Sequence, residues 1–192
     1  MRLLVLAVVV CTVIGWVTAT RAAQRVVVRS PRLGVLNLMG NDANRLIEDD
    51  LKALTPLFGK STQSTAAPPA CDVLFVYARV QDSGVVDGSK SGLREIIRDS
   101  GAKIVVVATE NTPDGYIAGA PNKPYGKANL VMTLERRGNR FASFYVRLFK
   151  MMFAGDTMPV AWVKLAPQVP GAKHEDTPGS IFAAEAGQIT FK

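Results

Sequence analysis

The chain has 192 residues, of which 48% are hydrophobic and 20% are charged, as is typical of one globular domain with a short additional segment. Its formal net charge of +7 is concentrated at the start, because residues 1–41 contain five arginines and no acidic residue, leaving 18 basic and 16 acidic residues in the remainder. A nearly neutral body lacks the basic face that nucleic-acid binding requires, so we expect no nucleic-acid partner.

Residues 1–22 have the sequence of a signal peptide or a membrane anchor. Leu3–Thr20 is a run of 18 residues without a charge, which suits either a secretory signal or a short membrane helix. Small residues at positions 17–22 favour cleavage, whereas the four arginines between Arg21 and Arg32 resist translocation and favour an uncleaved anchor. A third alternative is an additional buried strand at Leu3–Val10. We expect entry into the secretory pathway or cell envelope, with membrane contact only through this segment.

We expect residues 23–192 to form a single domain. Its first half starts with two strands and a helix. Gln24–Pro31 is interpreted as an edge strand or a tether, and Leu33–Met39 as the first core strand. Gly40-Asn41-Asp42 is expected to begin a helix that Pro56 ends or bends, with Asn41 or Asp42 as its N-cap. Its apolar residues recur at helical spacing (Ala43, Leu46, Ile47, Leu51, Leu54), and Glu48, Asp49 and Asp50 are interpreted as a solvated face.

The middle of the chain alternates between buried strands and helices. After a polar loop at Gly59–Ala70, Asp72–Val80 is a second expected strand, and Ser91 is expected to cap a helix that Gly101 ends in a left-handed conformation. Ala102–Asn111 follows, and its four consecutive apolar positions predict the centre of a sheet covered on both faces. Strands that alternate with helices favour a parallel sheet with right-handed crossovers.

The last third begins with an irregular segment, Thr112–Lys127, which is long enough to suggest a functional lid. Asn129–Glu135 is a fourth expected strand, Arg140–Met152 an amphipathic helix with an aromatic stripe, and Met158–Ala166 a fifth strand. Two short extended pieces near the end suggest a terminal hairpin (Ile181–Ala184 and Gln188–Phe191). The predicted fold is α/β, a three-layer domain with a mostly parallel sheet of about five strands, flavodoxin-like or Rossmann-like in build.

No catalytic motif is complete in this sequence. Gly59-Lys60-Ser61 lacks the upstream glycine of a phosphate-binding loop, because Leu54 occupies that position. Lys90 stands where the nucleophile elbow of a hydrolase needs serine. Cys71 and His174 are the one Cys–His combination outside the leader, and the predicted topology places them at opposite ends of the sheet. Histidines and cysteines are too few for a zinc site.

Polar residues instead gather at the predicted carboxyl ends of strands. Asn41 and Asp42 follow the first core strand, and Glu110 and Asn111 follow the third. If those two strands are neighbours, the four side chains meet in one crevice, roofed by Tyr116 or Tyr125 from the long loop. Asp42 and Glu110 could then hold Mg²⁺ or Ca²⁺, and the free N–H groups at the helix start favour a small anionic ligand.

This pattern favours a ligand-binding or sensor module, with its site at the carboxyl edge of the sheet, over an enzyme. The alternative is a divalent-metal-assisted hydrolase that uses the strand-end carboxylates. A membrane-tethered scaffold is a third class, and it would expose a contiguous apolar patch away from this edge.

The segment 1–22, the predicted leader, gives a first testable prediction. The mass of the protein purified from an exporting host should correspond to a chain that begins near Thr20 or Ala23 if the segment is a signal peptide. A full-length mass in the membrane fraction would identify an anchor. A full-length, freely soluble protein with Leu4 and Val8 buried in the sheet would contradict the prediction of a targeting segment.

Overall fold

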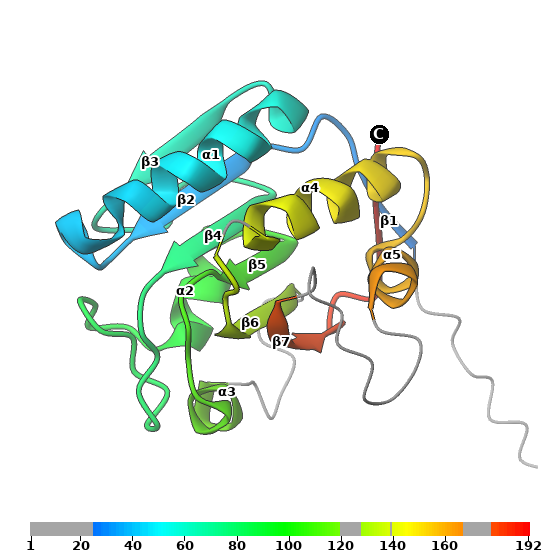
Figure 1. The fold of residues 1–192 in the computed structure, drawn as a ribbon. Helices are drawn as coiled ribbons and strands as arrows, with labels where there is room; N and C mark the ends of the chain where they lie inside the picture. The colour runs from blue at the N-terminus through cyan, green and yellow to red at the C-terminus, as the bar shows by residue number, and fades with distance from the viewer. Residues whose placement is uncertain (1–24, 120–127, 139, 167–177) are drawn as a thin grey trace, which may run out of the picture.

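The computed structural model of this chain describes residues 25–119, 128–138, 140–166 and 178–192 (Figure 1). The predicted leader, Tyr125 and His174 lie outside these residues. No helix within the described ranges is both long enough and apolar enough to cross a membrane.

A six-stranded sheet forms the centre of the described part of the molecule (Figure 1). Its strands lie in the order β3-β2-β4-β5-β6-β7. The first five are mutually parallel, and β7 is antiparallel to β6. Their bounds are β2 Leu33–Asn37, β3 Ser61–Ser64, β4 Val73–Tyr77, β5 Ile104–Val107, β6 Asn129–Glu135 and β7 Gly179–Ala183. The prediction of a mostly parallel α/β sheet is therefore confirmed.

The strand β5 lies between β4 and β6, as its continuous apolar sequence predicted. All four of its residues are fully buried. Ile104 and Val106 belong to the apolar core on one face of the sheet, and Val105 and Val107 belong to the core on the other face. A strand without a polar face is stable only where both faces are covered, which is the case here.

Helices cover both faces of the sheet. The helices α1 (Asn44–Phe58), α4 (Arg140–Phe153) and α5 (Met158–Leu165) pack on one core, and α2 (Leu93–Ser100) packs on the other. Tyr116, from the short helix α3 (Pro113–Gly119), also packs against the apolar core that α2 covers. The aromatic stripe of α4 is buried as predicted: Phe75 of β4 meets the rings of Phe141 and Tyr145 edge to face.

Three expected elements have a different secondary structure, and one of them is the expected irregular segment 112–127, whose described part contains the helix α3. The predicted strand Met158–Ala166 is the helix α5, in which Met158 and Ala161 are buried and Val160 and Val163 are exposed. Short apolar runs suit either structure, and Pro159 in the first turn favours a helix start. Within the expected loop 59–70, residues 61–64 form the edge strand β3, whose polar side chains suit a partly exposed sheet edge.

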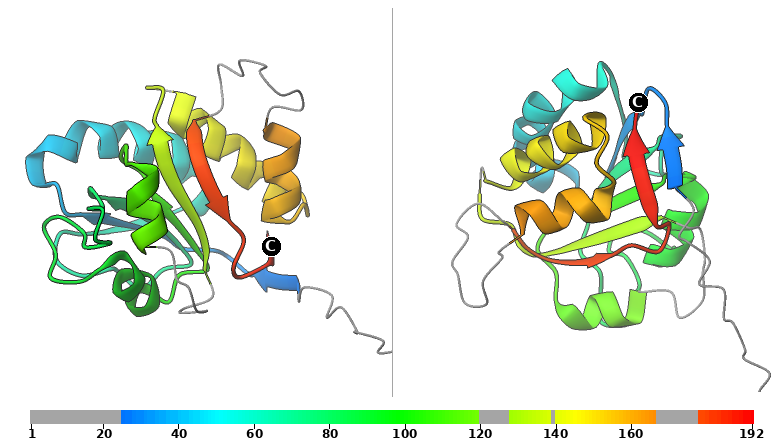
Figure 2. Two further views of the ribbon diagram at one scale, coloured as in Figure 1. Left: turned by 90° about the horizontal axis from the view of Figure 1, so that it is seen from below. Right: turned by 90° about the vertical axis from the view of Figure 1, so that its right-hand side faces the viewer.

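The predicted terminal hairpin is also wrong. The strand β7 pairs with β6, whereas β8 (Gln188–Phe191) pairs in parallel with β1 (Arg25–Val28) in a separate two-stranded sheet. The right-hand view of Figure 2 shows β1 and β8 side by side. The side chain of Asn129 stabilises the turn between β7 and β8, because it donates to the Gly187 carbonyl and accepts from the Ala186 N–H.

The helix ends differ in detail from those expected. Asn41 and Asp42 do not cap α1: they lie in a 3-10 turn, η1 (Gly40–Ala43), and α1 follows it from Asn44. Pro56 lies inside α1, which continues to Phe58. The residue before α2 is Gly92 rather than Ser91. Gly101 ends α2 with φ 65°, the left-handed conformation predicted.

The central position of β5 generates a stability prediction. Val105→Ala and Val107→Ala should each lower the free energy of unfolding by about 1–3 kcal/mol, because each removes buried methyl groups and leaves a cavity. Urea unfolding measures this change. Val85→Ala, at a residue that is 39% exposed, is the control and should change stability by less than about 0.5 kcal/mol. Unchanged stability in both core variants would contradict the central position.

Candidate functional site

Asp50, which the sequence pattern assigned to a solvated face, is buried in the structure. It is only 2% exposed, so that prediction is wrong. The reason lies in helical spacing: Asp50 is three residues after Ile47 and four before Leu54, and both of those residues are buried in the core. The same spacing in the sequence could have identified Asp50 as an inward-facing carboxylate.

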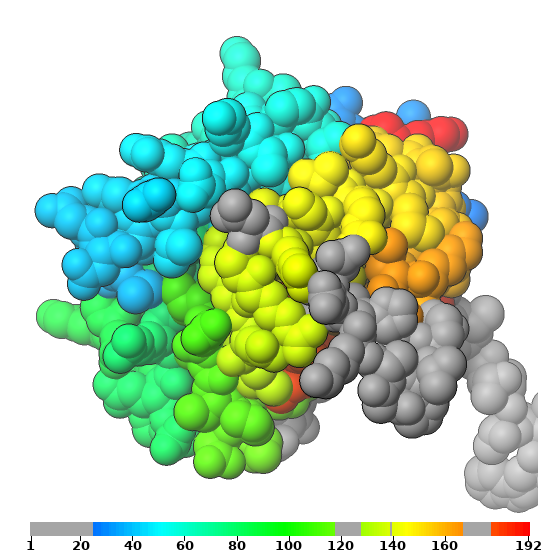
Figure 3. Space-filling model, viewed as in Figure 1, coloured from blue at the N-terminus to red at the C-terminus, as the bar shows by residue number. Residues whose placement is uncertain are grey.

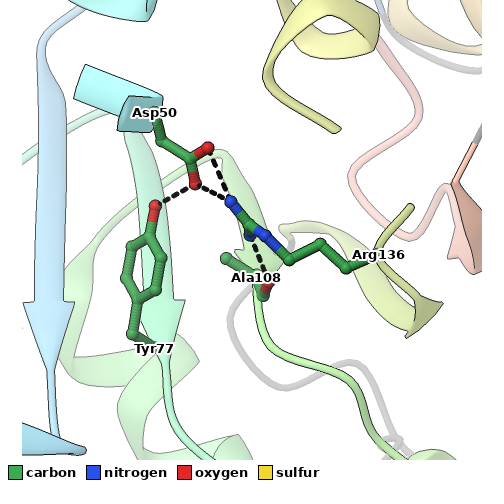
Figure 4. Close-up of polar contacts among 4 residues, drawn as sticks. All are labelled: Asp50, Tyr77, Ala108 and Arg136. Atoms are coloured by element: carbon green, nitrogen blue, oxygen red, sulfur yellow. Dashed lines mark hydrogen bonds and ion pairs between the residues drawn. The ribbon is translucent and has the colours of Figure 1, made fainter. Parts of the chain in front are cut away.

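The partner of Asp50 is Arg136, which directly follows β6 and is 8% exposed. Figure 4 shows its guanidinium group between Asp50 and the carbonyl of Ala108. One terminal nitrogen, Nη2, lies 2.6 Å from both carboxylate oxygens of Asp50, and the other, Nη1, donates to Ala108 O at 2.7 Å. The guanidinium carbon also lies 3.9 Å from the centre of the Phe141 ring, a cation–π contact.

Tyr77, the last residue of β4, completes the network because its hydroxyl donates to the Asp50 carboxylate (Figure 4). Burial raises the pKa of Asp50, an effect that Arg136 and Tyr77 partly offset. Burial also raises the pKa of Tyr77, and the negative charge of Asp50 adds to this shift. Tyr77 therefore remains a protonated donor at neutral pH.

Around Arg136, several buried polar atoms have unused hydrogen-bonding capacity. In the described part of the chain, no partner with hydrogen-bond geometry is found for Arg136 Nε, Thr133 Oγ1 or Tyr145 OH. Burial raises the pKa of Tyr145, and a hydrogen-bonding interaction with Thr133 and the positive charge of Arg136 partly offset this shift. The Thr133 and Tyr145 hydroxyl groups therefore lie near each other and partly satisfy each other, although not with strict hydrogen-bond geometry. Unpaired buried polar groups are costly, and they often mark a site for water or a ligand.

A groove of about 420 Å³ opens above this network, between α1 and the start of α4. Figure 3 shows α1 and α4 side by side on the face that contains it. The residues that line the groove are Arg45, Leu46, Asp49, Asp50, Ala53, Arg136, Gly138, Ala142 and Ser143. The buried ion pair thus contributes to the wall of a cavity of the size that small-molecule sites have.

The structure separates the strands that the predicted crevice required to be neighbours. The strand β4 lies between β2, which precedes Asn41 and Asp42, and β5, which precedes Glu110 and Asn111. The expectation that the first and third core strands are adjacent is therefore wrong. Asp42 is exposed on η1, and Tyr116 is half-buried on α3. Whether these residues bind a ligand or a metal ion stays a prediction.

Glu110 and Asn111 do lie together, in a second and shallower hollow of about 350 Å³ that Arg79, Val80 and Thr112 also line. Glu110 is joined to the buried network, because its carboxylate accepts a hydrogen bond from the backbone N–H of Arg136 at 2.9 Å. Asn111 accepts from the Val80 N–H and donates to the Thr109 carbonyl, so its side chain stabilises the loop after β4.

Within the described ranges, no group of three or more His, Cys, Asp and Glu side chains is placed to hold a metal ion. A scan against protein-family models found no match, and searches of curated proteins and of solved structures found no significant match.

The ion pair generates a prediction that a double-mutant cycle can test. Asp50→Leu and Arg136→Met should each destabilise the protein by about 3–5 kcal/mol, because each leaves an unpaired buried charge. The double variant should lose much less than the sum, since it contains neither charge. Urea unfolding of the four proteins measures the coupling. If the loss of stability in the double variant equals the sum of the two single losses to within about 0.5 kcal/mol, the two residues do not act as a pair.

Proposed function

We propose that this chain is a ligand-binding module that takes a small anionic molecule in the groove between α1 and α4. The observation that carries this proposal is Arg136, a buried cation that lines the groove and has an Nε–H without a hydrogen-bond partner in the described residues. Arginine binds carboxylate and phosphate groups well because its guanidinium donors match the geometry of these anions.

The position of the groove supports a binding role. If the strands of the main sheet are numbered in chain order, they lie in the order 2-1-3-4-5-6, and the first five match the flavodoxin-like order. We therefore assign a flavodoxin-like build as part of this proposal. Open sheets of this kind bind ligands beyond the carboxyl ends of their strands. Arg136 and Tyr77, at the carboxyl ends of β6 and β4, bring the buried network to that edge.

The charges of the groove indicate what kind of anion it would bind. Asp50 is paired with Arg136. The charged residues at the exposed rim are Arg45 and Asp49, for which no ion pair is found among the described residues. Arg45 would contact the anionic group of the ligand. Asp49 opposes a bare anion and favours one that also carries a cationic or hydroxyl group. An amino acid is a simple molecule with both features.

The proposed setting is the secretory pathway or cell envelope, reached through residues 1–22. The alternative function is a metal-assisted hydrolase that uses Asp42 and Glu110. We rank it second because β4 separates the strands that precede these carboxylates. To test this alternative, the thermal stability of the protein is measured with and without Mg²⁺ or Ca²⁺. The metal should stabilise the unsubstituted protein and should not stabilise the Glu110→Gln variant.

Thermal unfolding of the full chain with glutamate, citrate or inorganic phosphate tests the binding proposal. A ligand at about one hundred times its dissociation constant adds about 2.7 kcal/mol of stability, which raises the midpoint of a domain this size by about 5–10 °C. Glutamate should give the largest shift, because it carries both an anionic and a cationic group.

Arg45→Glu should abolish this shift without destabilising the protein, because Arg45 is an exposed residue at the rim. Lys52→Glu is the matched control: it makes the same charge change at an exposed position of α1 that does not line the groove. A shift that survives Arg45→Glu, or that Lys52→Glu removes equally, would contradict binding in this groove. The absence of a shift with every probe would contradict the proposed ligand class.

A further inference from the structure

We propose that the end of the molecule formed by β1, the end of α4 and α5 docks on the surface of an anionic lipid bilayer. We call this surface the docking face and define it by four exposed apolar residues: Val27, Phe153, Val160 and Val163. The proposal concerns a part of the molecule remote from the groove and does not depend on the ligand proposed above.

Exposed apolar side chains are concentrated on this face. Six large hydrophobic residues are exposed in the described part of the chain, and four of them form the docking face, with exposed fractions of 46% for Val27, 36% for Phe153, 42% for Val160 and 61% for Val163. The other two, Val85 and Ile117, lie in the loop before α2 and in α3. Clustered exposed apolar residues are a feature of surfaces that bind proteins or membranes.

The elements that carry these residues are neighbours. A hollow of about 450 Å³ is lined by Val27 from β1, Phe153 from α4 and Phe191 from β8. The helix α5 packs against both α4 and β8. The right-hand view of Figure 2 looks at this end of the molecule, where α5, β8 and β1 face the viewer together.

The charge of the docking face favours anionic lipid over a neutral apolar partner. Arg25 and Lys192 line the same hollow as Val27 and Phe153. Arg29 is exposed just after β1. Asp156, a described acidic residue near the end of α4, is paired with Lys164 at 2.8 Å, so it does not cancel the charge of Arg25 and Arg29. Exposed apolar side chains surrounded by basic ones bind at the headgroup level of anionic bilayers.

The preceding sequence adds an independent reason for a lipid partner. The uncharged run Leu3–Thr20 ends shortly before Arg25, where β1 begins. A fully extended chain from Thr20 to Arg25 reaches at most about 17 Å. If that run enters a bilayer, it therefore holds β1 and the docking face close to the lipid surface.

Fluorescence quenching by lipid can test the docking face in the full chain. A Cys11→Ser background leaves Cys71, which is buried and whose thiol pKa is raised to about 12 by burial, so Cys71 should not react with a thiol-specific label. An environment-sensitive fluorophore is attached through Val160→Cys and, as the matched control, through Val85→Cys. Each labelled protein is mixed with phosphatidylcholine vesicles containing brominated lipid, with or without phosphatidylglycerol.

The label at position 160 should be quenched at least about three-fold more than the label at position 85, and only when phosphatidylglycerol is present. Combining Arg29→Glu with Lys192→Glu should reduce that quenching to the control level. Equal quenching at both positions, or none at position 160, would overturn the proposal. Shielding of position 160 without lipid would also overturn it. Shielding that depends on protein concentration would identify a second copy of the chain as the occupant, and shielding that does not would identify another segment of the same chain.

Discussion

The ion pair between Asp50 and Arg136 is the interaction on which the carboxyl edge of this sheet depends. Arg136 follows β6, and its side chain contacts α1 through Asp50, the end of β5 through the Ala108 carbonyl and α4 through the Phe141 ring. Tyr77 links the end of β4 to the same network, because its hydroxyl donates a hydrogen bond to Asp50. One guanidinium group therefore fixes two helices relative to three neighbouring strands.

Burying such a pair requires a large desolvation free energy. Removing a carboxylate and a guanidinium from water costs several kcal/mol per ion, and their attraction offsets this cost only when the remaining donors and acceptors are also satisfied. Here the carboxylate has three hydrogen bonds, from Tyr77 and Arg136, whereas Arg136 Nε has no partner in the described residues. Apolar residues could join the helices as firmly, so the unused donor favours a role in binding over a purely structural one.

The sequence predicted the parts of the fold that depend on local pattern. The strands β2, β4, β5 and β6 and the buried stripe of α4 are predictable because a continuous apolar run or a helical period is visible in the chain. The helix α5 is not, because an eight-residue apolar run suits a strand equally well. Asp50 was missed because Leu51 was counted on the apolar stripe in its place, and because its partner Arg136 lies 86 residues away. No local pattern could reveal that partner.

The helix α4 connects the two proposed surfaces and keeps them apart. Its first turn contributes Ala142 and Ser143 to the groove, and its last residue, Phe153, belongs to the docking face. A helix of 14 residues is about 20 Å long at a rise of 1.5 Å per residue. The groove and Phe153 therefore lie at opposite ends of this helix. The two proposals thus place a ligand and a lipid surface at separate parts of the molecule, and neither proposed surface includes a residue of the other.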